Sequence, residues 1–266
     1  MVKSGVKEHM KQVIQSRRTG RLALKHVPAP QVKRGHVLVR TRTSLISAGT
    51  ERMVVDFAKK SLAGKAKARP DLVKKVIEKA KRDGLKATFQ NVLTRLDEPL
   101  PLGYSAAGDV IGVGVGLEGV YAVGQRVAMA GAGVANHAEV NAVPENLLAT
   151  VPDDVTDEAA SFATLGAIAM HAARNLGAGL GDVVAVLGCG LVGQLAAQIL
   201  TLSGTRVVAL DYDPGRLKLA SELGVELACN LADDGLAAAV REITAGRGCD
   251  GVIIAAATES SEPFET

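Results

Sequence analysis

Three glycines and one acid have the types and the spacing that could hold a phosphate-bearing ligand. Gly188, Gly190 and Gly193 form a G-x-G-x-x-G pattern, and Asp211 follows eighteen residues later. An apolar run precedes the glycines, a helix-like stretch follows them, and a second apolar run ends at the acid. This order predicts a strand, a tight turn, a helix and a second strand, in which backbone N–H groups bind a pyrophosphate.

Each position in the pattern has its own physical task. Gly188 allows the tight turn off the strand, Gly190 lets the backbone approach the pyrophosphate, and Gly193 lets the helix pack closely on the sheet. The helix is expected to begin near Leu191, so that the N–H groups of Leu191 and Val192 and the positive end of the helix dipole point at the phosphates. A glycine pattern on its own is weak evidence for a dinucleotide site, since the same spacing also occurs in an ordinary turn before a helix. With both strands, the helix and the acid present, we predict a dinucleotide site.

Two charged side chains bear on which dinucleotide is bound. The Asp211 carboxylate can accept hydrogen bonds from the adenosine ribose hydroxyls, and its charge would repel a 2′-phosphate. NAD is therefore favoured over NADP. Arg216, about one helical turn further on, could pair with either the ribose or a phosphate. The sequence leaves these two roles open.

Composition limits the class of protein. The chain has 266 residues, 47% hydrophobic and 22% charged, which is typical of a soluble protein with one large domain or two. Cys189, Cys229 and Cys249 lie far apart with no CxxC spacing, so we expect a reducing cytoplasm and neither disulfides nor a cysteine zinc site. No signal peptide is visible, and no apolar run reaches the roughly 18 residues of a membrane span. A cytoplasmic protein without a membrane partner is expected.

The charge is unevenly distributed along the chain. Residues 1–95 hold 24 Lys and Arg against 6 Asp and Glu, a balance of +18, and the remainder holds 7 against 22, a balance of −15. Either two domains have complementary surfaces, or a basic surface meets an anionic substrate or an acidic partner. Nucleic acid is disfavoured because the chain has no Trp, only 3% aromatic residues and no supporting motif.

Alternation of apolar residues, with frequent glycines, predicts short strands and a distorted β-barrel in the first part of the chain. Between these strands, a Lys-rich stretch predicts helices. One has Leu72, Val73, Val76, Ile77 and Ala80 on one face, and a second lies near 85–96. The strands of the barrel are expected near residues 11–47, 101–114, 123–130 and 135–140.

Strands and helices alternate in the last part of the chain, which predicts a parallel sheet with right-handed crossovers. Thr156 is expected to cap one helix, and Asp213 a second helix that has Pro214 in its first position. Four strands are expected near 183–187, 207–210, 226–229 and 251–256, whereas a doubly wound dinucleotide fold has about six. We expect a chain truncated relative to its natural parent, or an edge covered by a partner.

Four segments resemble the medium-chain dehydrogenase/reductase family, whose members are similar to alcohol dehydrogenase. Ala48-Gly-Thr-Glu51 is similar to its Cys-Gly-Thr-Asp segment, and residues 103–114 to its Gly-His-Glu block. Residues 123–128 match its Gly-Asp-Arg-Val turn, and residues 159–173 its helix before the cofactor strand. The resemblance implies a GroES-like distorted β-barrel domain at 1–152 with a basic helical insertion at about 52–98. An incomplete Rossmann domain, a doubly wound parallel sheet that binds NAD, would follow at 153–266.

The chain departs from this family at the zinc ligands. Zinc-dependent members use a Cys, a His and a second Cys, and the matched positions here are Ala48, Tyr104 and Thr164. Alanine has no ligand atom, and neutral hydroxyl groups are poor zinc donors compared with thiolate and imidazole. His137 and His171 are scattered and are expected to be satisfied core or surface residues. We therefore predict no metal site and no zinc.

Without a metal, hydride transfer would depend on positioning and on hydrogen bonds to the developing oxyanion. Thr50 matches the position of the hydroxyl in the family's proton relay, and Tyr104 could donate its O–H to a substrate oxygen. Both also have simpler interpretations, because Thr50 can close a turn and Tyr104 can fill the emptied metal pocket. Glu51 is expected to pair with a nearby base or arginine.

The insertion at about 52–98 resembles that of two-part oxidoreductases, in which such a half precedes a dinucleotide-binding half of the Gfo/Idh/MocA type. The leading hypothesis is a zinc-independent, NAD(P)-linked oxidoreductase for a polar, sugar-derived or anionic alcohol or carbonyl substrate. The alternatives are an NADPH-dependent quinone or alkene reductase, and a non-catalytic NAD-binding module of a larger two-part protein. The expected partners are a small-molecule substrate, a covalently fused second half and further copies of the chain.

Overall fold

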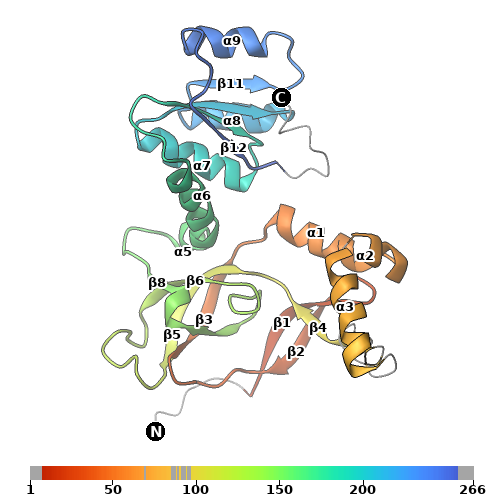
Figure 1. The fold of residues 1–266 in the computed structure, drawn as a ribbon. Helices are drawn as coiled ribbons and strands as arrows, with labels where there is room; N and C mark the ends of the chain where they lie inside the picture. The colour runs from red at the N-terminus through yellow and green to blue at the C-terminus, as the bar shows by residue number, and fades with distance from the viewer. Residues whose placement is uncertain are drawn as a thin grey trace. The chain divides into compact units, whose positions relative to one another are not determined.

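The computed structural model describes residues 8–68, 70–84, 88, 90, 94 and 97–256 (Figure 1). The chain forms two compact units, Met1–Ala163 and Thr164–Thr266. The first unit is therefore longer by eleven residues than the domain proposed from the sequence, which ended at 152. The helix expected near 85–96 falls largely outside the described residues.

The first unit is built on two antiparallel sheets. Three strands pair in the order β2-β1-β4, and five pair in the order β7-β3-β5-β6-β8. A single bridge between Gln12 and Ala138 connects the two sheets. The strands are β1 His9–Ser16, β2 Leu22–Pro28, β3 His36–Ser44, β4 Pro99–Pro101, β5 Ser105–Val113, β6 Arg126–Ala130, β7 Val140–Pro144 and β8 Leu148–Thr150. The distorted β-barrel expected from the sequence is confirmed.

The curvature of the five-stranded sheet depends on its glycines and its alternating apolar residues. Val37 and Val39 of β3 are fully buried against Val110 of β5, as their period of two requires. The register between β3 and β5 shifts at Thr41. A Cβ at Gly108 would overlap the carbonyl oxygen of the neighbouring strand, so only glycine permits this close approach.

A helical insertion separates β3 from β4, as the Lys-rich stretch predicted. It contains α1 (Ala48–Lys59), α2 (Leu62–Ala68) and α3 (Pro70–Asp83). The α1 helix ends against the turn between β1 and β2, where the side chain of Lys59 leaves room only for a glycine at position 20. The Lys65 ammonium of α2 donates to the carbonyl of Arg17 in the same turn (2.9 Å). These contacts fix α1 and α2 on the β1–β2 hairpin.

The prediction of a strand at 135–140 is wrong. Residues 132–139 form a loop, and β7 begins only at Val140. Gly131 and Gly133 have positive φ angles, which end the preceding strand. Asn141 then supports the loop from inside, since its side chain accepts from the N–H of Asn136 (3.1 Å) and donates to the carbonyl of the same residue (3.1 Å).

The helix expected near 156–175 is two helices, α5 (Asp157–Ala160) and α6 (Ala163–Leu176). Thr156 caps α5 as predicted, because its hydroxyl accepts from the N–H of Ala159 (3.2 Å). Asp157 also forms ion pairs with Arg42 (3.2 Å) and Arg126 (3.3 Å) of the barrel. These ion pairs hold α5 in the first unit.

The second unit is a parallel sheet in the order β11-β10-β9-β12, which is the 3-2-1-4 part of a doubly wound fold. Its four strands and their register confirm the sequence prediction. The elements are β9 Val183–Leu187, α7 Leu191–Leu202, β10 Arg206–Asp211, α8 Pro214–Glu222, β11 Leu227–Asn230, α9 Leu236–Ile243 and β12 Gly251–Ile254.

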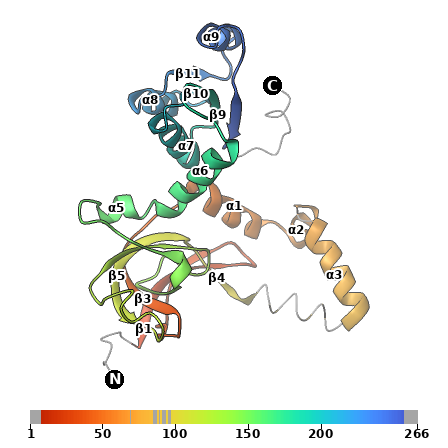
Figure 2. The same cartoon turned by 60° about the vertical axis from the view of Figure 1, so that its left-hand side comes forward.

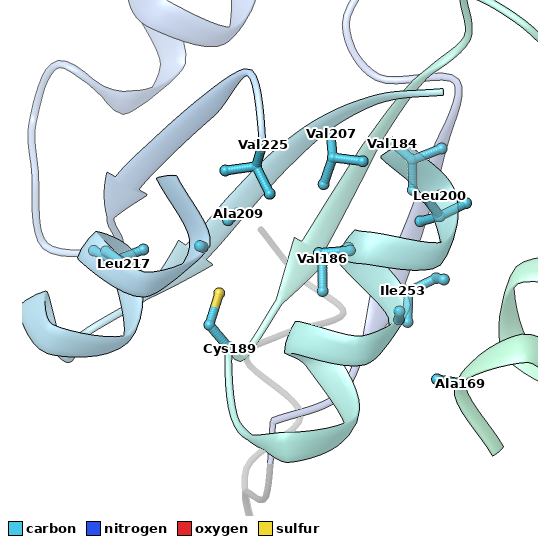
Figure 3. Close-up of a cluster of buried hydrophobic side chains, with 13 residues drawn as sticks. Ala169, Val184, Val186, Cys189, Leu200, Val207, Ala209, Leu217, Val225 and Ile253 are labelled. Carbon is cyan, nitrogen blue, oxygen red and sulfur yellow. The ribbon is translucent and has the colours of Figure 1, made fainter. Parts of the chain in front are cut away.

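Both faces of this sheet are buried, as expected for parallel strands covered by crossover helices. Val184 and Val186 of β9 pack with residues of α6, α7 and α8 (Figure 3). Val183 and Leu187, on the other face of the same strand, pack with residues of α9. Among the described residues, no helix has both the length and the apolar character needed to cross a bilayer.

The close approach at Gly108 makes the first testable prediction. Replacing Gly108 with alanine should destabilise the first unit by about 1–3 kcal/mol, because β3 and β5 must move apart. Gly49→Ala is the matched control, since a Cβ there meets no atom within 4 Å. Thermal unfolding followed by circular dichroism measures both variants. If Gly108→Ala unfolds at the wild-type temperature, the close approach of β5 to β3 at this position is contradicted.

Candidate functional site

The glycine turn at the end of β9 has the geometry that the sequence predicted. Gly188 has a φ of +91°, in the left-handed region, and a Cβ there would lie 2.6 Å from the backbone nitrogen of Ala256. Its N–H donates to the carbonyl of Leu210 (2.7 Å), which connects the turn to β10. A side chain at this position would therefore meet both a strained backbone and a steric clash.

The other two glycines differ in what surrounds them. A Cβ at Gly193 would overlap the carbonyl oxygen of Gly188, so α7 lies directly on the turn. A Cβ at Gly190 would meet no atom within 4 Å. Gly190 is also the N-cap of α7 and supplies no capping side chain. The first N–H groups of α7, those of Leu191 and Val192, thus begin beside open space, as a phosphate site requires.

Asp211 ends β10 beside this turn. Its Oδ2 accepts from the N–H of Cys189 (2.7 Å), and its Oδ1 accepts from the N–H of Asp213 (2.9 Å). Burial acts to raise the pKa of Asp211, but these two N–H groups and the Arg216 guanidinium outweigh it, and the pKa lies below its ordinary value. The carboxylate is therefore ionised at neutral pH, with further lone pairs able to accept hydroxyl groups.

Arg216 lies on α8 and pairs with the acid of the site. Its Nη1 is 3.4 Å from Oδ2 of Asp211, and its side chain is 54% exposed. Asp213 caps the same helix by accepting from the N–H groups of Gly215 (2.8 Å) and Arg216 (3.1 Å), with Pro214 in the first position as predicted. The guanidinium partly neutralises the carboxylate and remains accessible to a ligand.

Sequence reasoning did not identify Cys189 as part of this arrangement. Its N–H holds the Asp211 carboxylate, while its side chain points into the core of the second unit (Figure 3). Burial raises the pKa of the thiol to about 11, and the neighbouring Asp211 carboxylate adds to the shift. The thiol is thus a neutral core group at physiological pH and is not a candidate nucleophile.

The first unit contains a second cluster of polar side chains, centred on His137. Its Nε2 lies 3.0 Å from the carboxylate of Glu51, and its Nδ1 lies 2.8 Å from the hydroxyl of Ser44. The side chains of His137 and Glu51 are only 10% and 12% exposed. Since a carboxylate can only accept, a neutral imidazole here carries its hydrogen on Nε2 and accepts from Ser44.

This cluster adjoins the two residues that the sequence proposed as catalytic. Thr50 is exposed in the first turn of α1, directly before Glu51. Tyr104 is half-buried and directly follows Gly103, whose left-handed backbone packs on His137: a Cβ at Gly103 would lie 2.6 Å from its nitrogen. Glu51 pairs with a base, as expected, and that base is His137. The structure does not test the catalytic roles of Thr50 and Tyr104.

The residues at the positions matching zinc ligands are poor donors for zinc. Ala48 has no donor atom, and Tyr104 and Thr164 offer hydroxyl groups. Within the part of the chain that the structure describes, no group of three or more His, Cys, Asp and Glu side chains could hold a metal ion.

Comparison with known proteins shows which dehydrogenases this chain is similar to. A family model described as zinc-binding dehydrogenase matches residues 192–262. The chain is 30% identical over 179 residues to (R,R)-butanediol dehydrogenase of Bacillus subtilis and 32% identical over 180 residues to L-threonine 3-dehydrogenase of Chelativorans. The chain is thus similar to members of the medium-chain dehydrogenase/reductase family.

These matches cover only part of each protein. The butanediol dehydrogenase alignment covers 58% of this chain and 51% of the relative, and the threonine dehydrogenase alignment covers 57% and 52%. The chain thus spans about half the length of these curated relatives.

Solved structures share the fold of this chain. An Escherichia coli alcohol dehydrogenase in complex with NADH is 20% identical, with a TM-score of 0.72 over 96% of this chain and 71% of that chain. A mycobacterial quinone oxidoreductase is 25% identical, with a TM-score of 0.64 over 91% of this chain and 66% of that chain. The same mycobacterial protein has been solved with NADPH.

Substitutions at two of the site glycines should separate cofactor binding from stability. Gly190→Asp should retain the melting temperature, because Asp is a good N-cap in open space, and should abolish NADH binding by repelling the phosphates. Gly193→Ala should weaken NADH binding and lower the melting temperature, with a destabilisation of about 1–3 kcal/mol from the clash with Gly188. Calorimetric titration with NADH and thermal unfolding measure the two properties.

Gly166→Ala is the control for this series, because it lies in a helix where a Cβ meets nothing within 4 Å. It should change neither the affinity nor, by more than about 1 kcal/mol, the stability. Wild-type NADH affinity in Gly190→Asp would show that α7 does not bind the pyrophosphate.

Proposed function

We propose that this chain binds NAD and acts as a zinc-independent oxidoreductase on a polar, sugar-derived or anionic alcohol or carbonyl compound. The observation that carries the proposal is the ionised Asp211 carboxylate, held at the end of β10 by the N–H of the glycine turn (2.7 Å). That position suits hydrogen bonds to the adenosine ribose and opposes a 2′-phosphate. The strongly basic first 95 residues support an anionic substrate.

When bound, the nicotinamide supplies or accepts the hydride. The chain's own residues then have three tasks. Backbone N–H groups at the start of α7 hold the pyrophosphate, and Asp211 orients the ribose. In the first unit, Tyr104 and Thr50 donate hydrogen bonds to the substrate oxygen as it gains or loses charge.

His137 supports this chemistry as a positioning residue. Its hydrogen bond to Glu51 lies in the first turn of α1, one residue from Thr50. Its backbone packs against Gly103, one residue from Tyr104. The imidazole thereby connects the two segments that carry the proposed donors, and Glu51 fixes its tautomer.

A second candidate function is the NADPH-dependent reduction of quinones or activated alkenes. The specific observation in its favour is the 25% identity to the mycobacterial quinone oxidoreductase, whose structure has also been solved with NADPH. The exposed guanidinium of Arg216 could serve such a cofactor by pairing with a 2′-phosphate. The cofactor preference therefore distinguishes the two functions.

Asp211→Asn tests the cofactor assignment. The variant should bind NADH about 10- to 100-fold more weakly, since a hydrogen bond to a charged group contributes about 1.5–3 kcal/mol. Its NADPH affinity should change less, because the charge that opposes a 2′-phosphate is gone. Fluorescence titration with each cofactor measures this, with the exposed Asp234→Asn as the charge-matched control. Tighter binding of NADPH than NADH by the wild type would instead favour the quinone or alkene reductase.

Tyr104→Phe tests the proposed chemistry. It should lower kcat about 100-fold and leave the NADH affinity unchanged, because only the donor to the substrate oxygen is lost. Reduction of NAD is measured with a panel of sugar alcohols and sugar acids as hydride donors, and Tyr121→Phe of the same unit is the control. The chelator 1,10-phenanthroline should leave the wild-type rate unchanged. An unchanged kcat in Tyr104→Phe removes this residue from the mechanism.

A further inference from the structure

Helix α3 presents an apolar face on which Val76 and Ile77 are exposed and Val73 and Ala80 are half-buried. Val73, Val76, Ile77 and Ala80 recur at the spacing of one helical face. Val76 is 40% exposed and Ile77 is 49% exposed. The helix packs against α2, away from the strands of the barrel (Figure 2). An exposed aliphatic row of this kind indicates a binding surface, because it contributes little to the core of its own unit.

The charged residues of α3 are ordered around this face. At about 100° of rotation per residue, Lys74 and Lys81 follow one edge of the apolar row and Lys79 follows the other. Asp71 and Glu78 fall on the opposite side of the helix, together with Lys75 and Arg82, so the charges there nearly balance and the excess of positive charge lies at the edges of the apolar row. Lysines at the edges can extend their aliphatic stems along an apolar surface while their ammonium groups reach its polar boundary.

This arrangement is complementary to a flat surface that is apolar below and anionic at its boundary. We propose that α3 lies in the interface of an anionic lipid bilayer, with Val76 and Ile77 directed toward the acyl chains and the three edge lysines toward the headgroups. The acids on the opposite side would then face water. A protein groove is less well matched, since the face contains none of the Trp, Tyr or Arg anchors that dominate such contacts.

A helix that lies in the interface needs no membrane-spanning segment. The sequence analysis expected no membrane partner because no apolar run reaches the length of a span. That argument does not apply to a helix lying parallel to the bilayer. The fold also provides an attachment, since α2 is fixed to the β1–β2 hairpin through Lys65 and the carbonyl of Arg17 (2.9 Å). The inference does not depend on the proposed oxidoreductase activity.

Vesicle co-sedimentation of the full chain tests the proposal. The chain should bind vesicles of phosphatidylcholine with one-third phosphatidylserine and should not bind pure phosphatidylcholine. Each lysine neutralised, as in Lys74→Gln and Lys81→Gln, should weaken binding about fivefold. The double variant Val76→Glu with Ile77→Glu should abolish it, and should fold normally because both side chains are exposed. Lys218→Gln, on α8 of the second unit, is the matched charge control and should have no effect.

A fluorescent reporter tests whether the apolar face enters the lipid. The chain has no Trp, so Ile77→Trp introduces a single tryptophan on the apolar face. Its emission should shift to shorter wavelength with phosphatidylserine vesicles and should not shift with phosphatidylcholine alone. Leu202→Trp, at an 88% exposed position of the second unit, is the control and should not shift.

Three results would overturn the proposal. Absence of binding to both kinds of vesicle is the first. The second is vesicle binding that survives in the double variant Val76→Glu with Ile77→Glu, or equally tight binding of the chain to a polyglutamate peptide. In either case the positive charges alone would explain the binding. The third is a change of sedimentation coefficient in that double variant without lipid, which would identify a second copy of the chain as the occupant. NADH titration of each variant should give the wild-type affinity, so a failure here is separable from a failure of the cofactor assignment.

Discussion

Helix α7 can begin directly above the end of β9 only because Gly193 places no side chain against the carbonyl oxygen of Gly188. This single approach determines where the first N–H groups of the helix lie and which way its dipole points. A Cβ would displace the helix from the turn, and the strand, turn and helix would no longer share one corner. The phosphate site is therefore a property of backbone geometry, and the side chains of Leu191 and Val192 contribute little to it.

The acid at the end of β10 links this corner to the next strand. Asp211 is buried, which opposes its ionisation, but it receives the N–H groups of Cys189 and Asp213 and the guanidinium of Arg216. In the proposed site, this carboxylate would have a structural and a ligand-binding role together. It stabilises the turn, and its remaining lone pairs would face the hydroxyl groups of a bound ribose. This dual role explains why the group is kept charged in spite of its burial.

Local sequence pattern was sufficient to predict the second unit, because each of its features depends on neighbouring residues. The glycine spacing, the acid, the Asp213 cap with Pro214 and the four strands all follow from short segments of chain. The loop before β7 was mistaken for a strand because Val140 and its neighbours alternate, whereas Gly131 and Gly133 end the pairing. The break between α5 and α6 was missed since no Gly or Pro marks it.

The contacts that the sequence could not reveal join residues far apart in the chain. Glu51 and His137 are separated by 86 positions, and each alone has many possible partners. What brings them together is the left-handed backbone at Gly103, which allows the chain before β5 to lie against His137. Such a pair is specified by the closure of the barrel, which no local pattern describes. The candidate site of the first unit is thus predictable in its residue types but not in its connections.

The residues at the positions that match zinc ligands bear on the role proposed for the His137 cluster. With an alanine at one of these positions and hydroxyl groups at the other two, the proposed zinc-independent chemistry would depend on donors held in fixed positions. Fixed donors require a support whose own polar groups are satisfied, since a buried unpaired acid or imidazole would destabilise the barrel. Glu51, His137 and Ser44 satisfy one another within 3.0 Å at each link. In the proposed mechanism, this support would hold the segments of Thr50 and Tyr104 in fixed positions.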